Sequence, residues 1–138
     1  MSWIIFALLS AVFAALVAIF GKIGISNIDS TLATTVRSIV MASFLVLVSL
    51  ALGKFKFWSS IDNKALLFIV LAGISGAFSW LFYFFALRFG PASGVAALDR
   101  LSVVFVVIFA TIFLAEKLTW SVGLGAALIT AGALLMIL

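Results

Sequence analysis

The chain contains five long stretches of almost uninterrupted apolar residues, and no other feature limits its possible folds so strongly. The first, SWIIFALLSAVFAALVAIFG at residues 2–21, carries no charged residue. A helix needs about 20 predominantly apolar residues to cross the roughly 30 Å hydrocarbon core of a membrane. We therefore expect an integral membrane protein with five transmembrane helices, at about residues 2–21, 31–53, 65–87, 92–115 and 118–138.

Composition supports this expectation. Hydrophobic residues make up 67% of the 138 residues and charged residues only 9%, which is more apolar surface than a soluble domain of this length could bury. The apolar stretches are continuous, whereas barrel strands would alternate every second residue. The expected fold class is all-α: a polytopic membrane protein with a single domain over residues 1–138 and no internal repeat.

The residue types that are missing exclude several kinds of chemistry. The chain has no cysteine and no histidine, which removes thiolate catalysis, the commonest metal ligand and the usual proton carrier. The string GISG at 73–76 resembles the serine motif of rhomboid intramembrane proteases, but that serine needs a general base. The four carboxylates are spread over loops and helix ends: Asp29, Asp62, Asp99 and Glu116. We expect no enzymatic activity, no cofactor, no metal site and no nucleic-acid partner.

The basic residues bias the orientation only weakly. Five spans place the two ends of the chain on opposite sides of the membrane. The N-terminal side also carries four lysines: Lys54, Lys56, Lys64 and Lys117. The opposite side carries four basic residues, of which Arg37 and Arg100 are partly embedded: Lys22, Arg37, Arg88 and Arg100. Leaving out the embedded pair favours an N-terminus inside. Two alternatives stay open: one orientation set by the lysine-rich loop 54–64, or insertion in both orientations, which permits an antiparallel homodimer.

The third span has a face that combines small and polar aromatic residues. Ser79, Trp80 and Tyr83 share it with Gly73 and Gly76, while a row of phenylalanines forms another face. The indole N–H and the phenol need partners away from lipid, and large amphipathic rings commonly line sites for small organic ligands. Helix packing is the alternative interpretation. We expect the three polar residues, together with Arg37 of the second span, to line a substrate cavity.

The stretch VAALDRLSVV at 95–104 places Asp99 and Arg100 inside an apolar span. An ionisable residue at the centre of a span costs about 2.5–3.5 kcal/mol on insertion scales. Adjacent helical residues point about 100° apart, so each needs its own partner. Asp99 could pair with Arg37 or Arg88, and Arg100 could reach the headgroups. The pair is therefore expected to act as an ion pair that fixes packing, or as a polar gate. The positive charge at this end favours an anionic or zwitterionic substrate group.

From the third span onward the sequence resembles the EamA-type domain of the drug/metabolite transporter superfamily. The resemblance lies in ALRFGPAS, LSVVFVVIFATIFLAEKLT and GLGAALITAGALL, and Trp3, Lys22 and TLATTVRS also fit. Typical members have ten spans, built as two five-span repeats of opposite orientation. This chain looks like one such repeat, similar in that sense to the small multidrug resistance proteins, four-span chains that work as antiparallel dimers. Val103 stands where the family often has proline, and the first span lacks the acidic residue of the small multidrug proteins.

The resemblance implies a secondary transporter with its substrate site near the bilayer midplane, between two inverted repeats. One chain would supply one repeat, so we expect an antiparallel homodimer in the inner (plasma) membrane. It would move a small organic metabolite, amino-acid-like or otherwise anionic or zwitterionic, outward by alternating access. Two alternatives remain: a non-transporting accessory or assembly subunit, or a subunit of a lipid-linked-sugar flippase.

Overall fold

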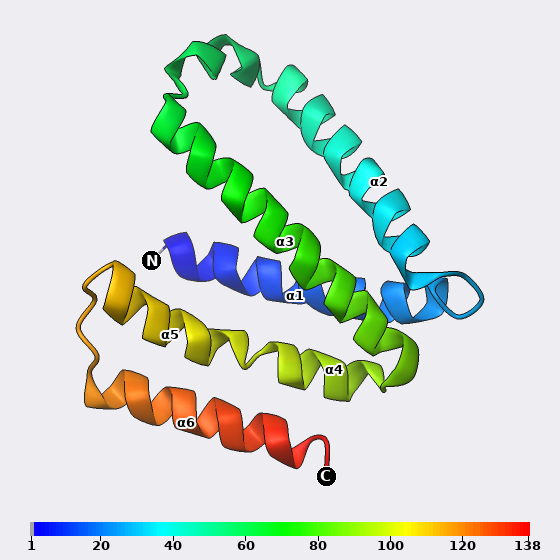
Figure 1. Ribbon diagram of the computed structural model, residues 1–138, viewed down its shortest axis with the longest axis vertical. Helices are drawn as coiled ribbons and strands as arrows, with labels where there is room; N and C mark the ends of the chain where they lie inside the picture. The colour runs from blue at the N-terminus through cyan, green and yellow to red at the C-terminus, as the bar shows by residue number, and fades with distance from the viewer. Residues whose placement is uncertain (1) are drawn as a thin grey trace. The chain divides into compact units, whose positions relative to one another are not determined.

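The computed structural model describes residues 2–138 and is built from helices, with no strand among those residues (Figure 1). The elements in chain order are α1 (Ser2–Gly24), α2 (Ser30–Ala51), the short 3₁₀ helix η1 (Lys54–Ser60), α3 (Asn63–Phe89), α4 (Ala92–Asp99), α5 (Ser102–Phe113) and α6 (Trp120–Leu135). This arrangement confirms the predicted class of an all-helical polytopic membrane protein.

Four helical stretches are long and apolar enough to cross a membrane: Trp3–Gly24, Ser30–Ala51, Asn63–Phe89 and Ala92–Phe113. The fifth, α6, has 16 residues and is also apolar. It begins at Trp120 because Thr119 caps it, accepting a hydrogen bond from Val122 N at 3.4 Å. At about 1.5 Å of rise per residue, α6 is shorter than the hydrocarbon core is thick. Residues 118, 119 and 136–138, expected in the last span, lie outside the helix.

The expected span 92–115 contains a break that the sequence analysis did not predict. Helix α4 ends at Asp99 and α5 begins at Ser102. Across the break the backbone hydrogen bonds join residues three apart instead of four. Leu101 N donates to Leu98 O and Val104 N donates to Leu101 O, both at 2.9 Å. The backbone of Arg100 and Leu101 stays in the right-handed helical region, and such a 3₁₀ stretch within a helix often marks a functional hinge. The break therefore coincides with the polar pair at 99 and 100.

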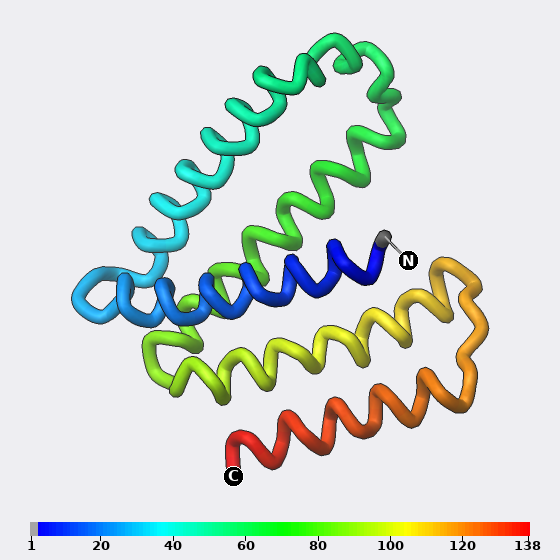
Figure 2. Tube along the Cα trace, turned by 180° about the vertical axis from the view of Figure 1, so that it is seen from behind, coloured from blue at the N-terminus to red at the C-terminus, as the bar shows by residue number. Residues whose placement is uncertain are grey.

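The chain divides into two compact units. One comprises the first helix up to Lys22 together with Phe89–Leu138. Within it, α6 lies alongside both α4 and α5 (Figure 2). Small residues allow this close approach: the buried Ala97, Ala110 and Ala133 belong to these three helices. The Lys22 Nζ donates a hydrogen bond of 2.8 Å to the Gly90 carbonyl, which ties the first helix to the start of this segment.

The second unit, Ile23–Arg88, consists mainly of α2, η1 and α3, with η1 joining the far ends of the two long helices (Figure 1). At the other end Asp29 caps α2 by accepting a hydrogen bond from Leu32 N at 2.9 Å. Its second oxygen lies 3.9 Å from Arg88 Nη1, near the end of α3. The two helices therefore run antiparallel, as the expected topology requires.

Gly94 in α4 allows a test of how tightly the first unit is packed. A Cβ at this position would lie 3.3 Å from Pro91 Cγ and 3.4 Å from Ile137 Cγ2. We expect Gly94→Val to lower the free energy of unfolding by about 1–3 kcal/mol, the usual cost of overpacking. Gly125→Val is the matched control, because a Cβ at Gly125 meets no atom of the described residues within 4 Å. Thermal unfolding in detergent micelles would measure both, and an equal loss in the two variants would contradict the packing described here.

Asp29 allows the helix cap to be separated from the ion pair. Asp29→Ala removes both and should lower the free energy of unfolding by about 1 kcal/mol, mostly through the lost cap. Asp29→Asn keeps an oxygen that can cap the helix and removes only the ion pair. Because that pair is half exposed and 3.9 Å apart, its loss should cost less than about 0.5 kcal/mol. The same unfolding assay checks this order, and an Asn variant as unstable as the Ala variant would contradict it.

Candidate functional site

The second unit brings together two of the residues singled out in the sequence. The Cζ of Arg37, on α2, lies 3.7 Å from the centroid of the Trp80 ring on α3. It also lies 5.7 Å from the Phe84 ring. A guanidinium within about 6 Å of an aromatic face is attracted by the ring quadrupole, most strongly by tryptophan. The contact therefore gives a charged side chain inside a membrane span an electrostatic partner that is not a carboxylate.

The α3 side of this contact is an aromatic cluster. Trp80 meets the Tyr83 ring edge-on at 5.5 Å between centroids and the Phe84 ring at 6.0 Å. The Tyr83 and Phe84 rings are 6.3 Å apart. Tyr83 and Phe84 come three and four residues after Trp80, and side chains at these spacings lie on the same side of a helix. Phe84 and Leu87 are buried, whereas Phe78 and Phe82 on another side are exposed, as lipid-facing residues of a membrane helix are.

Phe84 was not singled out in the sequence analysis. Its position four residues after Trp80 was the available signal, since side chains at that spacing meet on a helix. Leu87 carried no signal of its own.

The α2 side of the contact is polar, which the sequence analysis also missed. Thr34 Oγ1 donates to the Ser30 carbonyl and Ser38 Oγ to the Thr34 carbonyl, each at 2.8 Å. Bonds to the carbonyl four residues earlier are the usual way for a hydroxyl to be satisfied in a helix away from water. Ser30 and Thr34 are buried, and the Ser30 Oγ has no hydrogen-bond partner among the described residues. Arg37 thus extends a polar stripe along α2.

The edge of the Arg37 guanidinium is incompletely satisfied. Its Nη1 is buried and has no hydrogen-bond partner among the described residues. A guanidinium has five N–H donors in a planar fork that matches a carboxylate or a phosphate. A buried donor without an acceptor is costly, on the order of 1–3 kcal/mol. The arrangement therefore places an unsatisfied cationic donor next to an aromatic surface.

The other candidate residues are not part of this contact within the second unit. The Ser79 side chain is exposed, although the sequence analysis placed it on the same face as Trp80, because adjacent helical residues point about 100° apart. Asp99 and Arg100 are exposed and belong to the other unit, at the break between α4 and α5. Arg88, one possible partner of Asp99, has its Nη1 3.9 Å from an Asp29 oxygen within the second unit. Pairing of Asp99 with Arg88 or with Arg37 stays a prediction.

Metal binding finds no support in the described part of the chain, residues 2–138, where no group of three or more His, Cys, Asp or Glu side chains could hold an ion.

Comparison with known proteins identifies the family. The family model described as "EamA-like transporter family" matches residues 1–138. A relative from Sinorhizobium sp, named "Uncharacterized transporter in cobO 3'region", is 46% identical over 135 residues, which cover 98% of this chain and 96% of the relative. No solved structure gives a significant match. The resemblance seen in the sequence is thereby confirmed, and this chain, a membrane protein of apolar helices, belongs to the EamA-like transporter family.

Proposed function

We propose that the protein is a secondary transporter that exports a small organic metabolite with an anionic or zwitterionic group, such as an amino acid, across the inner membrane. The observation that carries this proposal is the Arg37 guanidinium, which lies 3.7 Å from the Trp80 ring while its Nη1 is buried without a hydrogen-bond partner in the described residues. A substrate carboxylate would supply the missing acceptor, and the rings of Trp80 and Tyr83 would contact the apolar part. Ser79 would contribute a hydroxyl at the margin of the cavity.

The proposed working form is an antiparallel homodimer that operates by alternating access. Transporters of this kind place the substrate between two inverted repeats, and this chain has helices for one repeat. The 96% coverage of the Sinorhizobium relative indicates that the relative, too, is about one repeat long. On α3, a Cβ at Gly73 or Gly76 would meet no atom of its own unit within 4 Å. A second copy could approach this open helix face closely.

Asp99 and Arg100 are proposed as a polar gate rather than as part of the substrate cavity. Both are exposed charged residues at the break in the fourth span. A 3₁₀ stretch in the middle of a helix often marks a functional hinge. A change in the α4–α5 break could therefore alternate access without unfolding a complete helix.

A counterflow assay with the purified protein tests the proposal. Liposomes of phosphatidylethanolamine and phosphatidylglycerol are preloaded with a mixture of unlabelled L-amino acids, and entry of isotope-labelled amino acids is measured. We expect accumulation of at least one labelled amino acid and no accumulation of the cation tetraphenylphosphonium. Movement of the cation alone would overturn the substrate class. Movement of neither would favour an accessory subunit, and translocation of a fluorescent lipid-linked sugar would favour the flippase alternative.

A further inference from the structure

The η1 segment between α2 and α3 has a regular pattern of side chains that transport does not explain. A 3₁₀ helix has three residues per turn, so side chains three apart lie above one another. The sequence KFKFWSS followed by isoleucine therefore forms three lines: the apolar Phe55, Trp58 and Ile61; the mixed Lys54, Phe57 and Ser60; and the polar Lys56 and Ser59. The η1 helix is therefore amphipathic, with an apolar side and a polar side.

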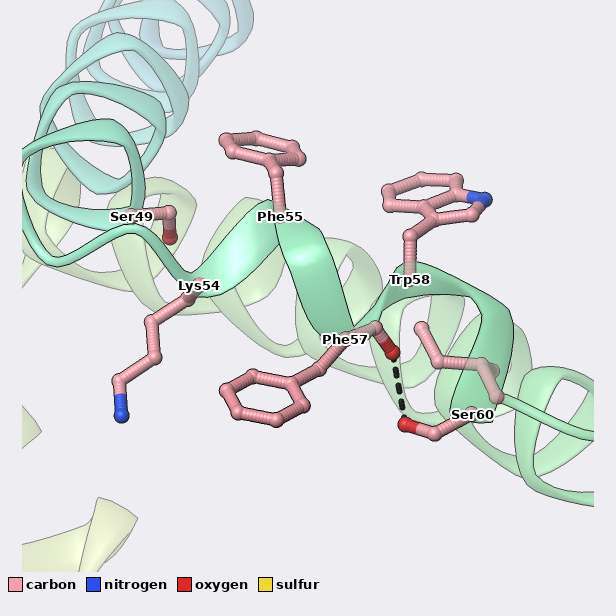
Figure 3. A pocket seen from close by; sticks show the side chains of 7 residues that line it. Ser49, Lys54, Phe55, Phe57, Trp58 and Ser60 are labelled. Atoms are coloured by element: carbon pink, nitrogen blue, oxygen red, sulfur yellow. Dashed lines mark hydrogen bonds between the residues drawn. The ribbon is translucent and has the colours of Figure 1, made fainter.

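The apolar line contains two aromatic rings in contact. The rings of Phe55 and Trp58 are stacked, with centroids 6.2 Å apart and planes 19° apart. Figure 3 shows these two rings on one side of η1, with Lys54 and Phe57 on the other. Trp58 is 69% exposed although it is among the largest apolar side chains. Exposed tryptophan between two membrane-crossing helices is typical of the boundary between hydrocarbon and headgroups.

Two lysines without an ion pair in the described residues lie close to one aromatic ring. The Nζ atoms of Lys54 and Lys56 are 5.9 and 5.1 Å from the centroid of the Phe57 ring. Neither lysine forms an ion pair within the described residues 2–138. Asp62, the nearest carboxylate in sequence, instead caps the following helix by accepting a hydrogen bond from Ala65 N at 2.7 Å. The positive charges of Lys54 and Lys56 can therefore interact with an anion from outside the chain.

A hollow of about 330 Å³ lies along this segment (Figure 3). It is lined by Ser49, Lys54, Phe55, Phe57, Trp58, Ser60 and Ile61. The lining combines a cation, hydroxyl groups and aromatic rings. This combination suits a ligand with an anionic head and an apolar body.

We infer that η1 is a binding site for an anionic phospholipid, with the lipid phosphate held by Lys54 and Lys56 and the acyl chains against Phe57, the ring that both lysines approach. Charge complementarity and location favour this ligand over a free anion. The site lies at the end of two membrane-crossing helices, where lipid phosphates are concentrated, and an anionic surface attracts each nearby lysine by about 1 kcal/mol. The inference does not depend on the proposed transport function.

Native mass spectrometry of the purified protein with phosphatidylglycerol or phosphatidylcholine tests this inference. We expect tighter binding of phosphatidylglycerol, and we expect the variant Lys54→Gln/Lys56→Gln to bind it about thirtyfold more weakly. Binding of phosphatidylcholine should be unchanged. The variant Lys54→Arg/Lys56→Arg keeps both charges and should retain phosphatidylglycerol, which separates loss of charge from loss of structure.

Lys64→Gln/Lys117→Gln is the matched control, because it removes the same charge from other exposed positions. It should change phosphatidylglycerol binding by less than about threefold. Equal weakening by the two glutamine variants would overturn the site in favour of general attraction. Equal binding of both lipids by the wild type would also overturn it, as would displacement of the lipid by millimolar glycerol 3-phosphate, which would identify a site for a free anion.

Discussion

Replacing Arg37 with glutamine should raise the KM for a zwitterionic substrate about 10- to 100-fold in the counterflow assay. The reason is the loss of charge-assisted hydrogen bonds, each contributing about 1.5–3 kcal/mol, where 1.4 kcal/mol corresponds to a tenfold change in affinity. Arg37→Lys should give an intermediate value, since lysine keeps the charge but loses the planar fork that lies against Trp80. Initial rates over a range of substrate concentrations would measure both effects.

Arg88→Gln is the matched control for this experiment. Arg88 is also an arginine of the second unit, but its partner is Asp29, and both side chains are about half exposed. A surface pair of this kind contributes little, so the KM should change by less than about threefold. Equal effects of the two substitutions would indicate that transport depends on the overall positive charge and not on a site at Arg37. Unchanged transport by Arg37→Gln would identify the contact with Trp80 as helix packing alone.

Single cysteines in opposite loops should each be labelled from outside in about half of the copies, as expected for insertion in both orientations. The chain contains no cysteine of its own. Ser59, on the polar line of η1, is a better position than Ser60, whose hydroxyl donates a hydrogen bond to the Phe57 carbonyl. Ser26 is exposed between α1 and α2, at the opposite end of α2. A membrane-impermeant maleimide is applied to intact cells and then to opened cells.

The cysteines at positions 59 and 26 serve as controls for each other. Insertion in one orientation would leave one cysteine fully labelled from outside and the other labelled only after the cells are opened. That result would contradict the antiparallel homodimer, and the repeat would then need an oppositely oriented partner chain. Half labelling at only one position would indicate that the reagent penetrates the membrane locally, and it would also count against dual orientation.

Some residues of the candidate site could be recognised from the sequence and others could not. Arg37 was recognisable because a charge in an apolar span is costly wherever it occurs, and Trp80 and Tyr83 because rings with polar groups need partners away from lipid. Thr34 gave no such signal, since a hydroxyl can be satisfied within its own helix. The break after Asp99 was also hidden, because the apolar pattern of Ala92–Phe113 continues on both sides of it.

The sequence by itself determined that this chain is a helical membrane protein with five apolar segments, because a bilayer requires long apolar helices whose backbone polar groups are satisfied internally. It also marked Arg37 and Trp80 as residues that need partners. Only the tertiary structure decided that the Arg37 Cζ lies 3.7 Å from the centroid of the Trp80 ring and that Arg88 Nη1 lies 3.9 Å from Asp29. Such pairings depend on the register between helices that are distant in the sequence. Lipid-exposed apolar surfaces do not encode that register, because every apolar side chain is equally satisfied by lipid or by another helix.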